Sequence, residues 1–215
     1  MARVSRAATP QRRLKQAYTD EARRIASRSM TGLAQTRLTP TALTVTGLLL
    51  CIAGGVAVHF QYRNHLLYYW LGAALFVVGS ILDILDGALA RAGGKATPFG
   101  AFIDSTTDRI GEAFMLGSIG LVFASEGNET ALAFAFAAVV GSFLVSYTRA
   151  RAEALGLRGD VGIGSRVERV IVITVGLVIA PWGGLQWAIY LLAATAWITV
   201  CQRIWSVRSQ LRDRG

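Results

Sequence analysis

The sequence predicts an all-α integral membrane protein with six transmembrane helices and an N-terminal amphipathic helix on the cytoplasmic side. Of its 215 residues, 53% are hydrophobic and 16% are charged, and the mean hydropathy is +0.45. Soluble proteins average about 45–50% apolar and about 25% charged residues. Six apolar segments approach the roughly 20 residues that a helix needs to cross a hydrocarbon core of about 30 Å. Lys and Arg gather beside alternate segments.

Residues 1–38 form a basic leader with nine Lys or Arg residues and two acidic residues. Between Gln11 and Gln35, apolar residues recur at spacings of 3 to 5 with arginines between them. This pattern predicts an amphipathic helix on the cytoplasmic lipid surface, where anionic headgroups attract Arg. A solvated basic tail is the alternative interpretation. The apolar run after the leader is too long for a signal peptide.

The six predicted spans follow in close succession. They cover residues 41–60, 66–89, 101–123, 130–155, 168–182 and 185–205. Helices are expected because backbone polar groups in lipid must be paired within the segment itself. Thr39-Pro40 breaks the chain before the first span. We therefore expect one catalytic domain over residues 39–208, followed by a cytoplasmic tail over 209–215.

Charged residues in the connections predict the orientation. The connection over residues 149–169 holds five arginines, and the C-terminal end holds four more. The other connections hold Arg63 alone, then two glutamates, then no charge. By the positive-inside rule, both termini lie in the cytoplasm, and we expect a bacterial cell membrane. The net charge of +9 then reflects topology, and nucleic acid is not an expected partner.

Four aspartates lie at one end of the second and third predicted spans. Asp83 and Asp86 are spaced i, i+3, and Asp104 and Asp108 are spaced i, i+4, so each pair projects from one helix face. A short turn containing glycine and proline joins the two spans, which favours antiparallel neighbours. We expect the four carboxylates to meet in one pocket near the cytoplasmic side.

Carboxylates at this depth require positive partners. Each ionised carboxylate costs at least about 2.5–3.5 kcal/mol on insertion scales. Arg91 and Arg109 could neutralise two of them, whereas two divalent cations would neutralise all four. Ligation by carboxylates alone suits Mg²⁺ or Mn²⁺, and paired ions stabilise phosphoryl displacement. The alternative is a set of aspartates that form salt bridges with Arg at a helix end.

The spacing of these residues resembles the signature of the CDP-alcohol phosphotransferase family. The pattern D-x2-D-G-x2-A-R-x8-G-x3-D-x3-D is filled by Asp83, Asp86, Gly87, Ala90, Arg91, Gly100, Asp104 and Asp108. The resemblance implies attack of an alcohol on the phosphoryl group of CDP-diacylglycerol, with release of CMP. The family also implies a homodimer in the membrane.

The resemblance also implies roles for individual residues. Asp83, Asp86 and Asp104 would bind metal, and Asp108 would bind metal and act as the general base. The CDP-diacylglycerol would contact Thr44, Gly87, Arg91, Thr97 and Gly100. At position 41 this chain has Thr where the family has Asn or Asp.

Three arginines suggest the acceptor. Arg149, Arg169 and Arg203, each at the cytoplasmic end of a predicted span, resemble the phosphate-binding basic residues of actinobacterial phosphatidylinositol phosphate synthases. Arg grips phosphate oxygens as a bidentate fork, so three would favour a phosphorylated alcohol, inositol 1-phosphate, over neutral inositol. Alternatively, they serve only as positive-inside markers.

Two other functions remain open from the sequence. A phosphatidylglycerophosphate synthase would use glycerol 3-phosphate, which also carries a phosphate. A divalent-cation transporter could also place carboxylates in a membrane. Against transport, all four aspartates lie near one side and leave no acidic path to the other.

Overall fold

The computed structural model describes residues 40–92 and 96–213, in which helices are joined by short turns and irregular connections and no strands occur. The predicted amphipathic helix of the leader lies outside the described residues. The helices are α2 (Pro40–His59), α3 (His65–Ala92), α4 (Pro98–Ser125), α5 (Glu129–Ala154), α6 (Arg166–Val178) and α7 (Leu185–Arg212). Two short 3₁₀ turns, η1 (Phe60–Arg63) and η2 (Ala180–Trp182), follow α2 and α6.

The observed helices match the six predicted segments in order, and every predicted start lies within three residues of an observed one. Four segments of the described chain are long and apolar enough to cross a membrane: α2 with η1, α3, α5 and α7. Helix α4 is as long but carries several charged residues in its first half. Helix α6 has 13 residues, which is about 20 Å at 1.5 Å per residue. The structure therefore supports an all-helical membrane protein with four candidate spans, and α7 continues to Arg212, beyond the predicted start of the tail.

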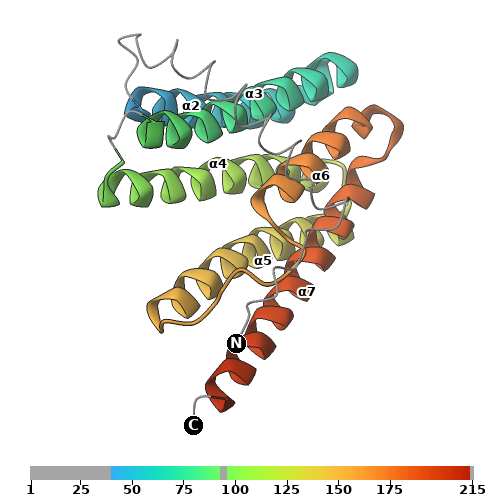
Figure 1. Cartoon of the computed structure of the whole chain (residues 1–215). Helices are drawn as coiled ribbons and strands as arrows, with labels where there is room; N and C mark the ends of the chain where they lie inside the picture. Colours follow the sequence, from blue (N-terminus) through green and yellow to red (C-terminus); the bar gives the residue numbers. More distant parts are fainter. Residues whose placement is uncertain (1–39, 93–95, 214–215) are drawn as a thin grey trace, which may run out of the picture.

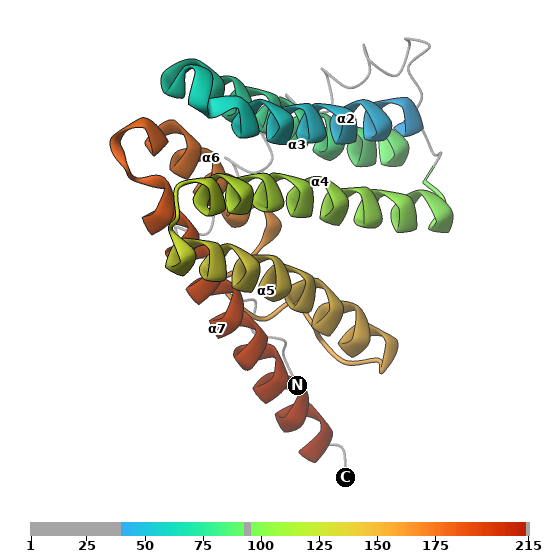
Figure 2. The same ribbon diagram turned by 180° about the vertical axis from the view of Figure 1, so that it is seen from behind.

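The helices form two groups that meet through α4 and α6. Helix α2 packs against both α3 and α4, and α5 packs against α4 and α7. Helix α6 contacts α3 and α7, so it joins the two groups (Figure 1). The view from behind shows the same order, with α4 between α2 and α5 (Figure 2). Apolar side chains of α4, α6 and α7, including Met115, Ile173 and Leu192, fill the interior.

Glycines bring α2 and α3 into backbone contact. A Cβ atom on Gly79 would lie 2.6 Å from the carbonyl oxygen of Gly47, and one on Gly54 would lie 2.9 Å from that of Gly72. Gly72 and Gly79 are seven residues apart, which is about two helical turns, so both lie on the same face of α3. Small residues at such positions let membrane helices approach closely. This contact places the start of α2 beside the acidic end of α3.

Side-chain caps define where α4 and α6 begin. The Thr97 hydroxyl accepts a hydrogen bond from the Gly100 amide at 3.0 Å, and Pro98 occupies the first turn of α4. Before α6, the Ser165 hydroxyl and the Glu168 carboxylate form a capping box, in which the carboxylate accepts from the Ser165 amide at 2.6 Å. These caps determine the helical register of the charged side chains that follow.

We expect Gly79→Ala to destabilise the protein, because the added methyl group would lie too close to both the Gly47 carbonyl and the Cys51 thiol. Overpacking of this kind costs about 1–3 kcal/mol. The matched control is Gly117→Ala on α4, where an added Cβ atom meets nothing within 4 Å. Melting temperatures in detergent check the prediction. Equal melting temperatures for the two variants would contradict the close α2–α3 contact.

Candidate active site

Three aspartates from two helices form an acidic cluster. Asp83 and Asp86 on α3 are buried, and Asp104 on α4 is partly buried. One carboxylate oxygen from each lies within 4.8 Å of the others. The expected meeting of the α3 and α4 carboxylates is therefore found for these three residues. We call Asp83, Asp86 and Asp104 the acidic triad.

The donor set of the acidic triad fits a hard divalent cation. Its ligands are carboxylate oxygens, the type that Mg²⁺ and Mn²⁺ prefer. Asp86 is only 2% exposed, and its Oδ1 atom has no hydrogen-bond partner in the described part of the chain. Its Oδ2 atom accepts a hydrogen bond from the Thr44 hydroxyl at the start of α2. A buried carboxylate with one oxygen lacking a hydrogen bond is costly unless a cation neutralises it.

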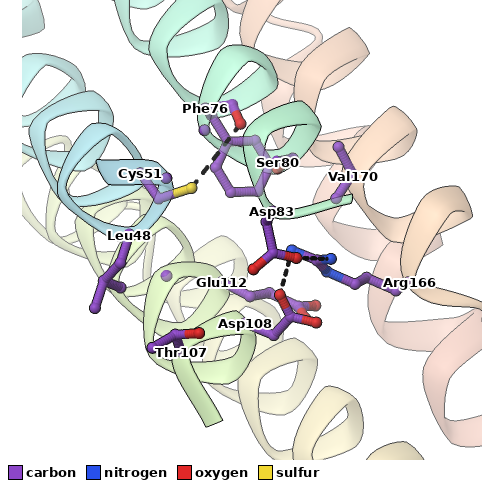
Figure 3. A pocket seen from close by; sticks show the side chains of 13 residues that line it. Leu48, Cys51, Phe76, Ser80, Asp83, Thr107, Asp108, Glu112, Arg166 and Val170 are labelled. Atoms are coloured by element: carbon purple, nitrogen blue, oxygen red, sulfur yellow. Dashed lines mark hydrogen bonds and ion pairs between the residues drawn. The ribbon is translucent and has the colours of Figure 1, made fainter. Parts of the chain in front are cut away.

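Asp108 lies one turn after Asp104 on α4 and pairs with Arg166 of α6. The Arg166 guanidinium also contacts Asp83, so it bridges carboxylates of α3 and α4 (Figure 3). The three side chains line a small cavity of about 20 Å³ between α2, α3, α4 and α6. Asp108 therefore sits beside the acidic triad with an arginine as its partner.

Arg166 was not among the residues predicted from the sequence. Arg91 and Arg109 were the expected counter-charges, but Arg109 donates a hydrogen bond to the Ser105 carbonyl of its own helix. The signal for Arg166 was its place directly after the helix cap Ser165, three residues before Arg169. That position did not distinguish it from arginines that mark topology, because the contact with Asp83 spans 83 residues of sequence.

A second cavity, of about 170 Å³, adjoins Asp108 on the side away from α2. The predicted arginines Arg149, Arg169 and Arg203 all line it, although they come from α5, α6 and α7. Arg109 and Arg166 add two more guanidinium groups, and the acidic groups in its wall are Asp108, Glu112 and Asp160. We call this space the arginine cavity. Its lining suits an anion that carries more than one negative charge.

Two of these arginines are held in place by the protein. Arg169 is 4% exposed, and its Nε and Nη2 atoms donate to the two Glu112 oxygens at 2.6 and 2.9 Å. Its Nη1 atom donates to the Gly164 carbonyl at 2.9 Å. The buried Arg203 donates from Nε to the Val161 carbonyl at 2.9 Å and from Nη1 to a carbonyl of α5. Both guanidinium groups are thus oriented before any ligand arrives.

Arg149 is held much more loosely. Its side chain is 57% exposed and forms an ion pair with Glu153 one turn later on α5, at 2.9 Å. Such exposed pairs along a helix contribute only about 0.3–0.5 kcal/mol. Arg149 can therefore reorient toward a ligand at little cost.

The residues expected to contact the nucleotide lie along the same end of α2, α3 and α4. Thr44 is bound to Asp86, and Gly87 follows Asp86 on α3. Thr97 and Gly100 lie at the exposed start of α4, joined by the cap described above. The side chain of Arg91 lies outside the described part of the structure.

Comparisons with known proteins agree with this geometry. Residues 37–207 match the CDP-alcohol phosphatidyltransferase family. The archaetidylinositol phosphate synthase of Pyrococcus horikoshii is 36% identical over 180 residues, which cover 83% of this chain and 88% of the relative. The phosphatidylinositol phosphate synthase of Mycobacteroides abscessus is 33% identical over 182 residues, which cover 82% of this chain and 80% of the relative.

Solved structures of the Mycobacterium tuberculosis phosphatidylinositol phosphate synthase share the fold. The structure in complex with manganese and citrate has a TM-score of 0.75 at 30% identity, covering 85% of this chain and 88% of that one. The structure with CDP-DAG bound has a TM-score of 0.74 at 31% identity, covering 86% and 94%. The structural match thus extends over most of both chains.

We expect Mn²⁺ to raise the melting temperature of protein that has first been treated with chelator. A ligand bound only by the folded state stabilises it by about 2.7 kcal/mol at 100 times its Kd. Asp86→Asn should abolish this shift, because it removes a charge from the acidic triad. The matched control is Asp160→Asn, which removes an exposed carboxylate outside the triad. A full Mn²⁺ shift in the Asp86 variant would contradict the assignment.

Proposed function

Because the chain belongs to the CDP-alcohol phosphatidyltransferase family, we propose that it transfers the phosphatidyl group of CDP-diacylglycerol to inositol 1-phosphate. The products are phosphatidylinositol phosphate and CMP. The two relatives described above are named as synthases of archaetidylinositol phosphate and of phosphatidylinositol phosphate. Membership of the family makes the protein an enzyme of phospholipid synthesis. The identity of the acceptor alcohol is our proposal.

The observation that carries the choice of acceptor is the arginine cavity beside Asp108. Arg149, Arg169 and Arg203 line one space of about 170 Å³ together with this carboxylate. A phosphomonoester carries up to two negative charges and offers several oxygens to guanidinium groups. Arg169 is already paired with Glu112, but the buried Arg203 donates to backbone carbonyls, and a neutral alcohol would bring no anion to its charge. A phosphorylated acceptor therefore suits the cavity better than free inositol.

The reaction that we propose uses Asp108 as general base. A hydroxyl oxygen of inositol 1-phosphate forms a bond to the phosphorus atom that bears the diacylglycerol. The bond from that phosphorus to the bridging oxygen breaks, and CMP leaves with the electron pair. The hydroxyl proton passes to Asp108, which is within the same cavity as the arginines. The arginines hold the acceptor phosphate so that the hydroxyl faces this carboxylate.

The acidic triad would hold a divalent cation, which when bound offsets negative charge on the pyrophosphate and on the departing CMP. Mg²⁺ and Mn²⁺ both suit its oxygen ligands. A second ion, with Asp108 as an additional ligand, is part of the proposal. Thr44 supports the site by donating its hydroxyl hydrogen to Asp86.

We also propose six membrane crossings, in which α4 and the short α6 span within the bundle formed by the four apolar helices. The acidic triad and the arginine cavity then lie at the cytoplasmic side, with both termini. Charged side chains are tolerated within a bundle when they face its interior and pair there, as those of α4 do with Arg166 and Arg169. The homodimer remains a prediction.

The direct test of the acceptor is CMP release from CDP-diacylglycerol by purified protein in the presence of Mg²⁺ or Mn²⁺. We expect release with inositol 1-phosphate and much less with glycerol 3-phosphate or free inositol. Preference for glycerol 3-phosphate would replace the proposed acceptor while keeping the family reaction. Absence of release with all three acceptors would overturn the transferase proposal for these substrates.

We expect Asp108→Asn to lower turnover by about 100-fold or more, the range that general-base catalysis contributes. A Mn²⁺-dependent rise in melting temperature should remain in this variant, from the ion that the intact acidic triad holds, and only the contribution of the second ion should be lost. The two measurements together separate the proposed roles. If turnover and the Mn²⁺ shift disappear together, Asp108 acts as a metal ligand only.

Arg149→Ala should raise the KM for inositol 1-phosphate about tenfold or more, since a hydrogen bond to a charged group is worth about 1.5–3 kcal/mol. The KM for CDP-diacylglycerol should change far less. The matched control is Arg151→Ala, which removes another exposed arginine of α5 outside the cavity wall. The same rise in both variants would show a general effect of positive charge.

A further inference from the structure

The arginine cavity contains a buried carboxylate that the proposed reaction does not use. Glu112 lies on α4, is only 9% exposed, and lines the cavity together with five arginines. A negative charge in this position repels an anionic ligand. Glu112 must therefore make a contribution to this cavity that outweighs its repulsion of phosphate.

The contacts of Glu112 identify this role. Both of its oxygens accept hydrogen bonds from Arg169, at 2.6 and 2.9 Å, in the bidentate geometry that is the strongest between these two side chains. The Gly164 carbonyl accepts a third hydrogen bond from the same guanidinium group. A guanidinium group has five N–H groups, so one on Nη1 and one on Nη2 remain for a ligand.

We infer that Glu112 is a positioning residue for the acceptor: it fixes the Arg169 guanidinium so that its two remaining N–H groups face the acceptor phosphate. This inference rests on the proposed function, because it assigns the phosphate of inositol 1-phosphate to the arginine cavity. Burial of both partners keeps Arg169 in one orientation, and a group that is already oriented loses less entropy when it binds.

The position of Glu112 on α4 adds a second consequence. Asp108 and Glu112 are spaced i, i+4, so they lie on the same face of one helix (Figure 3). Asp108 would receive the hydroxyl proton, and Glu112 would set the arginine that holds the phosphate of the same molecule. Because Asp108 and Glu112 lie on one rigid helix, α4 sets the distance between the Asp108 carboxylate and the Arg169 guanidinium group that Glu112 holds. The acceptor is thereby selected by the spacing between its hydroxyl and its phosphate.

Charge and positioning predict opposite effects when Glu112 is neutralised. Removing a negative charge from the cavity would by itself strengthen phosphate binding and lower the KM for the acceptor. Loss of the fixed Arg169 orientation would raise that KM. Glu112→Gln retains the size of the side chain and so tests which effect dominates.

The experiment is a double-mutant cycle of Glu112→Gln and Arg169→Gln, with kinetics normalised to folded protein. We expect Glu112→Gln alone to raise the KM for inositol 1-phosphate about tenfold, which corresponds to about 1.4 kcal/mol. In the Arg169→Gln background the same change should alter this KM less than about twofold, because the residue through which Glu112 acts is gone. The KM for CDP-diacylglycerol should change less than about twofold in all variants. The double variant removes both charges of this buried pair and leaves neither unpaired, so it remains measurable if a single variant folds poorly.

The matched control is Glu153→Gln, which removes the carboxylate of an exposed Arg–Glu pair near the same cavity. Its effect on the acceptor KM should be less than about twofold, since exposed pairs hold their partners weakly. Equal rises in the Glu112 and Glu153 variants, a lowered KM in Glu112→Gln, or equal effects in both Arg169 backgrounds would each overturn the inference. A change in melting temperature with unchanged KM would also overturn it. Wild-type protein that does not use inositol 1-phosphate would overturn the proposed function, and the inference with it.

Discussion

Compensation of buried charge is the constraint on which this structure depends. Helices α3 and α4 bring carboxylates together at one end of an apolar bundle, where each ionised group must find a positive partner or a cation. Helix α6 supplies arginines for this purpose: Arg166 pairs with Asp83 and Asp108, and Arg169 pairs with Glu112. Asp86 is different, because one of its oxygens is buried without a hydrogen bond in the described chain. The protein therefore neutralises part of the cluster itself, Asp83 included, and leaves Asp86 as the member of the acidic triad most in need of a cation.

Helix packing determines where these charges meet. The glycine contacts between α2 and α3 are close enough for the Thr44 hydroxyl to reach Asp86. The capping box at Ser165 begins α6 directly before Arg166, whose guanidinium group reaches Asp83 of α3 and Asp108 of α4. Backbone contacts and caps, which involve little charge, thus set the geometry of a strongly charged site. A small displacement of either helix would change several ion pairs together.

In the proposed reaction, the buried and the exposed arginines of the arginine cavity have different uses. Arg169 and Arg203 are buried and hydrogen-bonded to the protein, so their orientation does not depend on a ligand. Arg149 is mostly in solvent and forms an exposed ion pair with Glu153. In the proposed reaction, the fixed pair defines where the acceptor phosphate sits, and the exposed arginine can close on it. This division combines specificity with access from the aqueous side.

The sequence by itself determined the helical class, the order and starts of the helices, and the spacing of the aspartates, because hydrophobic runs and i, i+3 or i, i+4 periodicity are local properties. It also predicted Arg149, Arg169 and Arg203 at span ends, whereas α7 continues nine residues beyond Arg203. Tertiary structure alone decided that these arginines share one cavity, that Asp108 pairs with Arg166, and that Glu112 fixes Arg169. Those contacts join residues from helices distant in sequence, and they depend on how α6 crosses α3 and α4. The physical reason is that packing between helices determines the partner of a buried charge. The spacing of residues within one helix does not contain this information.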